Sequence, residues 1–296
     1  MDNSRIFVTG GNGQLGNALQ LILPGAHFTD SQEFDMTDPV SYEQVDWSQY
    51  DTIINAAAMT TVDGAETPEG AALAQKINAD GVKLLADTAS AHNLTFVHVS
   101  SDYVFDGTKT PHTEDEAFAP LSKYGQSKAD GDIAAASTAK HYILRTTWVV
   151  GKGKNFIRTM WDLAHRDIKP SVVNDQIGRL TFADDLAAGI KHLLEHSPTP
   201  NSQLPTADYG TYNLTNDGDV ASWADFAKIT YEAAGKSADD VTGVTTAKYY
   251  AGKEGIAPRP LQSEMDLAKI KGTGFTPRDW RVALDEYLEE LKKETV

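Results

Sequence analysis

Two short segments of the chain hold the side chains best suited to moving a proton. Tyr124 and Lys128 are four residues apart, so on a helix they share one face, about one turn apart. An ammonium beside a phenol favours the phenolate and would lower the pKa of Tyr124 from its usual value of about 10. A tyrosine tuned in this way exchanges a proton with a substrate oxygen near neutral pH. A hydroxyl of Ser100 or Ser101 could hydrogen-bond the same oxygen.

These side chains need elements that position them. The apolar run Thr95–Val99 is typical of a buried strand, and the two serines follow directly at its carboxyl end. Tyr124 to Lys128 fits the first turn of a helix. Because Tyr-x-x-x-Lys also recurs by chance in many helices, its weight depends on what precedes it in the chain.

A glycine-rich turn stands near the N-terminus. The β-rich run Arg5–Thr9 leads into Gly10-Gly-Asn-Gly-Gln-Leu-Gly16, and a helical pattern of apolar residues follows. Strand, glycine loop and helix in this order are the context of a dinucleotide-binding fingerprint. Glycine admits positive φ and a close approach to a pyrophosphate, and a helix N-terminus offers free N–H groups. The alternative is an ordinary tight turn, and two registers fit, starting at Gly10 or at Gly11.

The next strand, Ala26–Thr29, ends at Asp30. An acid at this position accepts the ribose hydroxyls of NAD, although Asp30 could equally be a turn residue before Ser31. No Arg or Lys lies within the following dozen residues to receive a 2′-phosphate, which favours NADH.

Strands and helices continue to alternate through the first half of the chain. Further strands are expected at 52–58, 95–102 and 142–148, with helices from about 68 to 92 and from 124. This alternation predicts an α/β fold with a doubly wound, parallel Rossmann sheet, whose ligands bind at the carboxyl ends of the strands. Four residues fall at such ends: Gly13, Ala58, Ser101 and Trp148.

Beyond Trp148 the pattern becomes irregular. Helices are expected at 156–164, 183–195, 222–235 and 280–292, short strands at 171–176 and 212–215, and a surface loop at Pro198–Asp208. We therefore predict a dinucleotide-binding domain of residues 1–149 plus about 177–216. A smaller, mixed α/β substrate lobe would contain about 150–176 plus 217–296.

Composition excludes several classes of function. The chain has 296 residues, a formal net charge of −16 and no cysteine. The charge argues against nucleic-acid and anionic-membrane partners, and the absence of cysteine fits a reducing, cytoplasmic compartment. No apolar run approaches the ~20 residues of a membrane span. The eight histidines show no zinc-ligand spacing, so we expect no metal site.

Several segments in order resemble the extended short-chain dehydrogenases/reductases: Thr9-Gly-Gly-Asn-Gly-Gln-Leu-Gly16, Asn55-Ala-Ala-Ala58, Ser100-Ser-Asp-Tyr-Val-Phe105, Tyr124-Gly-Gln-Ser-Lys128 and Arg145-Thr-Thr-Trp148. Within that family, the dTDP-4-dehydrorhamnose reductases are similar at three further places: Asn155-Phe156, Asn174-Asp-Gln176 and Ala257-Pro-Arg-Pro260. The resemblance runs from residue 5 to about 270. Its Ser-Asp-Tyr-Val-Phe and Asn-Asp-Gln segments are the more specific parts.

The resemblance implies reduction of the 4-keto group of dTDP-4-dehydro-6-deoxy-L-mannose by NADPH or NADH, the last step of dTDP-rhamnose synthesis for cell-wall polysaccharide. By motif, Ser101 would polarise the carbonyl, Tyr124 would donate the proton, and Lys128 would hold the nicotinamide ribose. By motif, Gly13, Gln14 and Leu15 would contact the cofactor pyrophosphate, Asp35 and Met36 its adenosine end, and Ala57, Ala58 and Ser100 would line the cofactor. The fingerprint itself adds Gly10 and Gly16, and the end of the second strand adds Asp30. The implied sugar contacts are Asp102, Tyr103 and Trp148, with Asn155, Lys154 and Arg259 as candidates for the nucleotide end.

Two implications concern metal and assembly. Some family members are dimers bridged by Mg²⁺ through glutamates, one of them early in the first helix. Here that part has Asn17-Ala-Leu19, so the sequence does not support Mg²⁺, and we expect a monomer or a weak dimer. Relatives also occur fused to the preceding epimerase, which leaves open that this chain is one part of a longer protein.

Sister functions remain as alternatives. A 4,6-dehydratase needs an Asp-Glu pair where this chain has Asp102-Tyr103, which argues against dehydration. Another nucleotide-sugar reductase or an epimerase stays open. So does a non-catalytic, nucleotide-binding module similar to the regulatory subunit of methionine adenosyltransferase. Turnover, as opposed to cofactor binding alone, distinguishes an enzyme from the non-catalytic module.

Overall fold

A parallel six-stranded sheet forms the centre of the larger lobe. In the computed structural model, residues 1–198 and 206–295 are described, so most of the loop expected at Pro198–Asp208 lies outside the described residues. The strand order is β10-β5-β4-β3-β1-β2. All neighbouring strands are parallel, which confirms the predicted sheet. The strands are β1 (Ile6–Thr9), β2 (His27–Thr29), β3 (Thr52–Asn55), β4 (Thr95–Ser101), β5 (His141–Thr146) and β10 (Gly210–Asn213).

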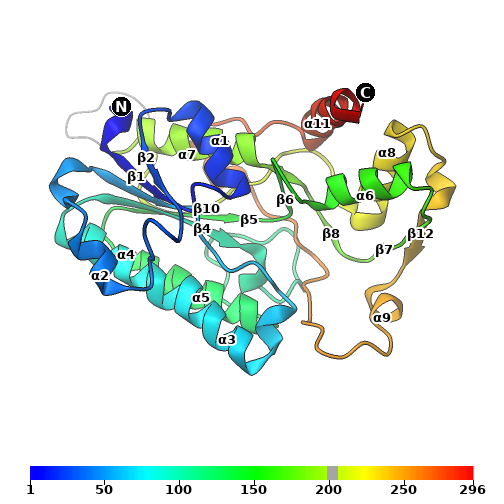
Figure 1. Cartoon of the computed structure of the whole chain (residues 1–296), viewed down its shortest axis with the longest axis horizontal. Helices are drawn as coiled ribbons and strands as arrows, with labels where there is room; N and C mark the ends of the chain where they lie inside the picture. The colour runs from blue at the N-terminus through cyan, green and yellow to red at the C-terminus, as the bar shows by residue number, and fades with distance from the viewer. Residues whose placement is uncertain (199–205, 296) are drawn as a thin grey trace.

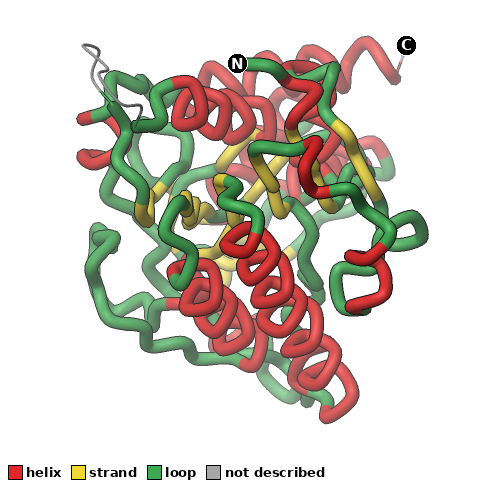
Figure 2. Tube along the Cα trace, turned by 90° about the vertical axis from the view of Figure 1, so that its left-hand side faces the viewer, coloured by secondary structure: helices red, strands yellow, loops and turns green. Residues whose placement is uncertain are grey.

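Helices cover both faces of this sheet, as Figures 1 and 2 show. One layer contains α1 (Gln14–Ile22) and α7 (Ala183–Glu195), and the other contains α2 (Pro39–Glu43), α3 (Pro68–Gln75), α4 (Gly81–Ala91) and α5 (Lys123–Ala136). Each layer closes its own apolar cluster against the sheet. Because helices cover both faces of the sheet, β1 and β3 are buried along their whole length. Strands buried on both faces have continuous apolar runs instead of alternation.

The helix starts follow from local sequence. Ser122 accepts a hydrogen bond from the Gly125 N–H and begins α5, and Thr67 does the same for α3 ahead of Pro68. Such caps satisfy N–H groups that the first turn leaves without a partner. They place the start of α5 one residue before Tyr124, as the sequence predicted.

The helix expected from 68 to 92 is interrupted by one π-helical turn, Lys76–Asp80. Within that turn the carboxamide of Asn78 bonds both the N–H and the C=O of Met59 and donates to the Ser127 hydroxyl. The turn therefore fixes the chain that leaves β3 against α5. Helical periodicity does not reveal such a turn, because a π turn differs from the α-helix by a single residue.

The smaller lobe lies beside the carboxyl ends of the strands (Figure 1). One of its apolar clusters is built on Trp161, Phe226 and Trp280, and the other on Met160 and Tyr231. Its helices are α6 (Phe156–His165), α8 (Trp223–Ala233), α9 (Thr246–Tyr249) and α11 (Trp280–Thr295), and its strand pairs are β7 (Ser171–Val173) with β12 (Thr242–Val244) and β8 (Ile177–Gly178) with β11 (Ala221–Ser222). The remaining short elements of the chain are β6 (Val149–Val150), β9 (Thr181–Phe182), α10 (Ala268–Gly272) and the 3₁₀ turns Asn3–Arg5, Trp47–Gln49, Gly64–Glu66, Asp102–Val104 and Ala238–Asp240.

Some predicted strand boundaries were wrong. The strand expected at 142–148 ends at Thr146, because Trp148 has a φ of 50°, which is incompatible with a strand. The strand expected at 171–176 ends at Val173, and the one expected at 212–215 is Gly210–Asn213.

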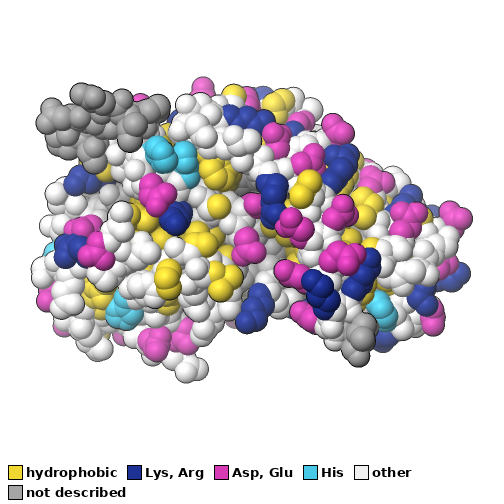
Figure 3. Space-filling view, turned by 90° about the horizontal axis from the view of Figure 1, so that it is seen from above, with side chains coloured by type: hydrophobic (Ala, Val, Ile, Leu, Met, Phe, Trp, Pro, Cys, Tyr) yellow, Lys and Arg dark blue, Asp and Glu magenta, His cyan; other side chains and the backbone are white. Residues whose placement is uncertain are grey.

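The surface mixes charges of both signs. Figure 3 shows acidic and basic side chains interspersed over the face seen from above. Among the described residues, none of the helices combines the length and the hydrophobicity needed to cross a bilayer.

Candidate active site

Two cavities meet at the carboxyl ends of the strands. One has a volume of about 460 Å³ and is lined by Ser101, Tyr124 and Lys128. The other has about 510 Å³ and lies between the ends of β1, β2 and β3 and the π turn. Both are lined by Gly13 and by the chain from Ala56 to Ala58. Together they form a continuous groove. One end lies at Ser101, Tyr124 and Lys128, and the other lies beside β2.

The turn between β1 and α1 is shaped for close backbone approach. Gly10 has a φ of +76°, and a Cβ there would lie 2.6 Å from the Ala57 nitrogen. A Cβ on Gly16 would lie 2.3 Å from the Gly10 carbonyl oxygen. Gly13, the N-cap of α1, has no side chain to cap the free N–H groups. The buried Oε1 of Gln14 has no hydrogen-bond partner. A helix N-terminus whose N–H groups have no side-chain cap fits a pyrophosphate, so these residues suit a dinucleotide.

The second cavity brings together the residues expected at the adenosine end. Asp30, Asp35 and Met36 all line it. Asp30 also accepts from the Gln32 and Glu33 N–H groups and from Asn12. Asp35 accepts from Thr37, and these hydrogen bonds hold its pKa below the usual value. Both carboxylates thus shape the turns that border the cavity.

A cation also reaches this cavity from a distant part of the chain. Lys76, the first residue of the π turn, is exposed and lines the cavity, where its charge helps to lower the pKa of Asp35. The sequence-based expectation of NADH considered only cations near Asp30. Nothing in the local sequence places Lys76 here, because the cavity forms only when the π turn and the chain after β2 come together in the fold.

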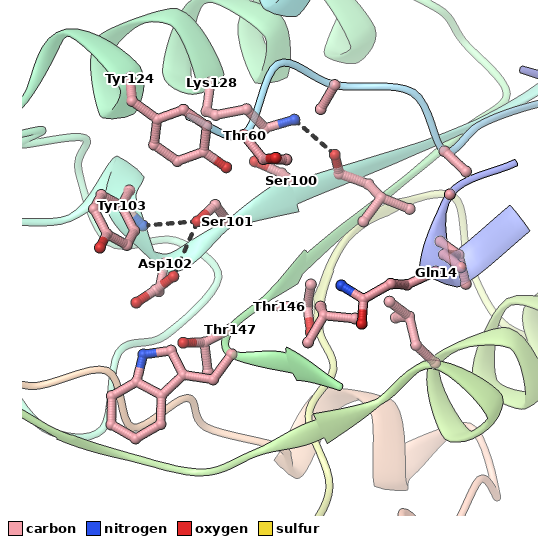
Figure 4. Close-up of a pocket in the computed structure, with 18 of the residues that line it drawn as sticks. Gln14, Thr60, Ser100, Ser101, Asp102, Tyr103, Tyr124, Lys128, Thr146 and Thr147 are labelled. Carbon is pink, nitrogen blue, oxygen red and sulfur yellow. Dashed lines mark hydrogen bonds between the residues drawn. The ribbon is translucent and has the colours of Figure 1, made fainter. Parts of the chain in front are cut away.

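The three residues expected to carry the chemistry come together. Figure 4 shows Tyr124 and Lys128 on one side of the cavity and Ser101 facing the phenol. Tyr124 is 8% exposed, and the ring of Tyr103 packs edge-on against it at 5.3 Å. The Lys128 ammonium donates to the Val99 carbonyl at 2.8 Å. Tyr124 and Lys128 lie on α5, and Ser101 lies on β4. These two elements pack against each other, which brings the three side chains to the same edge of the sheet.

The expected lowering of the Tyr124 pKa is wrong for this structure. Burial raises the pKa of Tyr124 to about 12, with a hydrogen bond to Ser101 acting in the opposite direction. Burial lowers the pKa of Lys128 to about 8. The phenolate is penalised by desolvation, and the Lys128 ammonium is directed to Val99 instead of the phenol oxygen. Tyr124 is therefore a neutral hydroxyl at pH 7, in the state of a proton donor.

Asp102 forms the floor of the same cavity. Its carboxylate accepts from Ser101 Oγ at 2.9 Å and from Ser263 Oγ at 2.6 Å. Burial raises its pKa, and the hydroxyl donors partly offset that rise. Ser101 in turn accepts from the Tyr103 N–H at 3.2 Å. Ser101 therefore donates its hydroxyl proton to Asp102. The hydroxyl must rotate before it can donate to a substrate carbonyl and polarise it.

Trp148 borders the cavity in a strained conformation. A positive φ is costly for a bulky residue and tends to occur at functional sites. Its indole stacks on Trp223 with ring centroids 4.0 Å apart. The stack anchors the catalytic cavity to the smaller lobe.

Two residues expected at the nucleotide end differ in their placement. Asn155 lines neither cavity. Its side chain caps α6 through the Arg158 N–H and donates to Tyr287 Oη, so the structure gives it a helix-capping role. Arg259 pairs with Asp63 at 2.8 Å and lies 4.9 Å above the ring of Tyr250. Its charge also acts on Tyr103, which places it beside the catalytic cavity.

Comparison with known proteins agrees with this geometry. A family model described as the RmlD substrate binding domain matches residues 4–293. A dTDP-4-dehydrorhamnose reductase of Aggregatibacter actinomycetemcomitans is 37% identical in an alignment of 297 positions that covers 95% of this chain and 97% of that protein. A probable dTDP-4,6-dihydroxy-2-methyloxan-3-one 4-ketoreductase of Streptomyces antibioticus is 37% identical over 246 residues, 81% of this chain and 77% of that protein.

Solved structures give the same result. The crystal structure of dTDP-4-dehydrorhamnose reductase from Bacillus anthracis in complex with NADP is 33% identical, with a TM-score of 0.85. The match covers 97% of this chain and 99% of that one. The similarity therefore spans both lobes and the groove at the carboxyl ends of the strands.

Proposed function

The chain belongs to the RmlD substrate binding domain family, among the relatives of the dTDP-4-dehydrorhamnose reductases, and we propose that it is such a reductase. It reduces the 4-keto group of dTDP-4-dehydro-6-deoxy-L-mannose to give dTDP-L-rhamnose, with NADPH or NADH as the reductant. The observation that carries this proposal is the groove, because it joins a dinucleotide turn to a buried Tyr124, Lys128 and Ser101.

The residues divide the reaction between them. The bound cofactor supplies a hydride to carbon 4 of the sugar. Negative charge then develops on the carbonyl oxygen, and Tyr124, which is protonated at neutral pH, gives it a proton. Ser101 donates a hydrogen bond to the same oxygen after turning from Asp102. Lys128, held by the Val99 carbonyl, binds the nicotinamide ribose and adds positive charge beside the phenol.

The sugar and nucleotide are held from both lobes. Asp102, Tyr103 and Trp148 face the sugar from the catalytic cavity. Arg259 lies beside that cavity, where its planar guanidinium suits a diphosphate. Asp63 holds Arg259 before the substrate binds, so the diphosphate would compete with that carboxylate. Gly13, Gln14 and Leu15 receive the cofactor pyrophosphate.

Absorbance at 340 nm tests the proposal. The substrate is generated in situ from its dTDP-4-keto-6-deoxyglucose precursor with the epimerase, and NADPH or NADH is then added with the protein. We expect the absorbance to fall only when the epimerase is present, because the reductase acts on the epimerised sugar. Cofactor binding without turnover on this sugar would contradict the proposal and favour a non-catalytic, nucleotide-binding role.

A second candidate is reduction of a different dTDP-keto-deoxysugar. The similarity to a Streptomyces antibioticus ketoreductase at 37% identity supports it, because that protein has a different substrate. This candidate predicts no absorbance loss on the epimerised sugar, and absorbance loss when a different dTDP-keto-deoxysugar is supplied with NADPH or NADH.

The setting of the enzyme is also part of the proposal. We infer a cytoplasmic protein that is a monomer or a weak dimer, consistent with the absence of cysteine and with the net charge of −16. We divide it into a dinucleotide-binding domain of residues 1–149 plus about 177–216 and a substrate lobe of about 150–176 plus 217–296.

A further inference from the structure

A buried group of charged side chains lies behind Lys128, and the reaction proposed above leaves it without a role. We propose that Asp132 is a positioning residue for the reduction: its carboxylate, fixed by Arg145 and on the same helix face as Lys128, keeps the Lys128 ammonium charged. This inference rests on the proposed function, since it assigns a role to Lys128 in that reaction.

Asp132 stands on the catalytic face of α5. It is four residues after Lys128 and eight after Tyr124, so all three lie along one side of the helix. Asp132 is only 1% exposed. Charged residues are almost never buried unless they are paired, so a carboxylate at this depth needs an explanation.

Arg145 on β5 is the direct partner of Asp132. Its Nε donates to Asp132 Oδ2 at 2.9 Å, and its Nη1 donates to the Glu114 carbonyl at 2.8 Å. The guanidinium also lies between the rings of Phe105 and Phe118. Because Arg145 is anchored on several sides, it can fix Asp132 without following the movements of Lys128.

The other carboxylate oxygen, Asp132 Oδ1, has no hydrogen-bond partner. Nε2 of His98, which is also without a partner, lies 3.8 Å away. The buried hydroxyl of Ser100 has no hydrogen-bond partner either. Burial raises the pKa of Asp132, and the charge of Arg145 and the nearby Ser100 hydroxyl oppose that rise. Buried polar atoms are nearly always paired. An unpaired carboxylate oxygen with two further unpaired polar atoms near its carboxylate therefore needs a functional explanation.

The hydrogen-bond pattern fixes the proton on His98. The Ala57 N–H donates to Asn55 Oδ1, so the Asn55 NH₂ group faces His98 Nδ1 at 3.1 Å. Nδ1 must accept this bond, and the proton of the neutral ring therefore sits on Nε2. Burial and the charge of Lys128 hold the His98 pKa well below its usual value, so the ring stays neutral. It thus aims an N–H at Asp132.

The consequence for Lys128 follows from its surroundings. Lys128 is 2% exposed, and burial alone would drive it toward the neutral amine. Asp132 is the one charged group that raises its pKa. The other ionisable groups that face the pair are Tyr124 on α5, the neutral His98 on β4 and Arg145 on β5, and none of these is an anion at neutral pH. Asp132 therefore decides how far into the alkaline range Lys128 keeps its proton.

The sign of the pH dependence is then fixed. In the unaltered protein, reduction should decline as the pH rises through the Lys128 pKa of about 8, because the charged ammonium is lost. In Asp132→Asn this decline should begin at least about one pH unit lower, the size of the effect of one nearby opposite charge. The loss should appear in kcat, with a small change in the KM for the cofactor.

The experiment combines pH profiles with a titration that needs no turnover. The Lys128 ammonium is followed by ¹⁵N NMR in the protein without substrate, and the signal is assigned with Lys128→Arg. Asp132→Asn should titrate at lower pH than the unaltered protein, and Asp132→Glu should restore the higher value. Asp130→Asn is the matched control, since Asp130 lies on the same helix and bonds only Gln126; its titration and pH profile should not move.

One variant guards against simple unfolding. Asp132→Asn leaves Arg145 buried without a counter-charge, which is destabilising, so the double variant Asp132→Asn/Arg145→Gln removes both charges. It should fold and show the same lowered titration. An unchanged Lys128 titration in both variants would overturn the role of Asp132. Failure of the unaltered protein to reduce the sugar would instead overturn the proposed function. The NMR titration needs no turnover, so it would still test whether Asp132 keeps Lys128 charged.

Discussion

At the scale of single residues, Tyr124 is the clearest target. Tyr124→Phe removes the proton donor and keeps the ring that packs on Tyr103. We expect kcat for sugar reduction to fall by about 10²- to 10⁴-fold, the usual contribution of general acid catalysis. The cofactor should still bind and raise the melting temperature, because binding to the folded state stabilises it. A variant with near-normal turnover would contradict the assignment of Tyr124.

Lys76 offers a second residue-scale prediction, on cofactor choice. It is the one Lys or Arg among the described residues that line the adenosine cavity. If it receives a 2′-phosphate, Lys76→Gln should raise the KM for NADPH by up to about five-fold and leave that for NADH unchanged. This is the size of an exposed ion pair of about 0.2–1 kcal/mol.

Lys83→Gln is the matched control for this change. Lys83 is equally exposed and pairs with Asp87 on α4, away from the cavity, so both cofactors should be used as before. An equal change in KM for NADH and NADPH in Lys76→Gln would show that the Lys76 charge does not bind the 2′-phosphate of NADPH.

The sequence predicted the positions of Tyr124 and Lys128 better than their electrostatics. Spacing alone put Tyr124 and Lys128 on one helix face, because helical geometry depends only on local sequence. The direction of the Tyr124 pKa was predicted incorrectly, because burial depends on every element that covers the phenol. Lys76 and Ser263 were missed for a similar reason, since each reaches the groove from a distant segment. Asp132 had a local signal, its four-residue spacing from Lys128, which was not used.

At the scale of elements, the contact between α5 and the π turn is the tightest near the site. A Cβ on Gly131 would lie 2.2 Å from the Asn78 carbonyl oxygen, which is backbone. Gly131→Ala should therefore force α5 away from the π turn and lower the free energy of unfolding by about 1–3 kcal/mol, the usual cost of overpacking. Urea denaturation measures this change.

Gly272→Ala provides the comparison. Gly272 ends α10, and a Cβ there meets nothing within 4 Å. The free energy of unfolding should then stay the same or rise by up to about 1 kcal/mol, because alanine is favoured over glycine in a helix. Equal destabilisation by both substitutions would mean that the contact between α5 and the π turn is not special.

Element types were predicted well where the sequence carries a period or a cap. The strands of the sheet needed only their apolar runs, and the spacing of Tyr124 and Lys128 placed the start of α5 within one residue. The boundaries failed at Trp148, where tertiary stacking on Trp223 accompanies a backbone conformation that no propensity favours. The π turn was also invisible, because its reason lies in the fit of Asn78 between two other elements.

At the scale of the whole molecule, Ser263 joins the C-terminal part of the chain to the catalytic floor. Its hydroxyl donates to the buried Asp102 at 2.6 Å. Ser263→Ala leaves that carboxylate with one donor fewer, so we expect the free energy of unfolding to fall by about 1–3 kcal/mol. Activity should fall as well, because Asp102 orients Ser101.

The control for this change is Ser137→Ala. Ser137 is exposed at the end of α5 and bonds only the nearby Ala134 carbonyl. Thermal denaturation should barely distinguish Ser137→Ala from the unaltered protein. If Ser263→Ala were equally silent, the link between the lobes through Asp102 would be unimportant.

The π turn at Lys76–Asp80 has a consequence for how related chains should be aligned. A π turn holds one residue more than an α-helical turn, so it amounts to a single-residue insertion between α3 and α4. Losing that residue would leave the buried faces of both helices in phase. A one-residue gap between related sequences is therefore expected within Lys76–Asp80, and not in the helices on either side. Any chain with that gap would need another group to do what Asn78 does here for Met59.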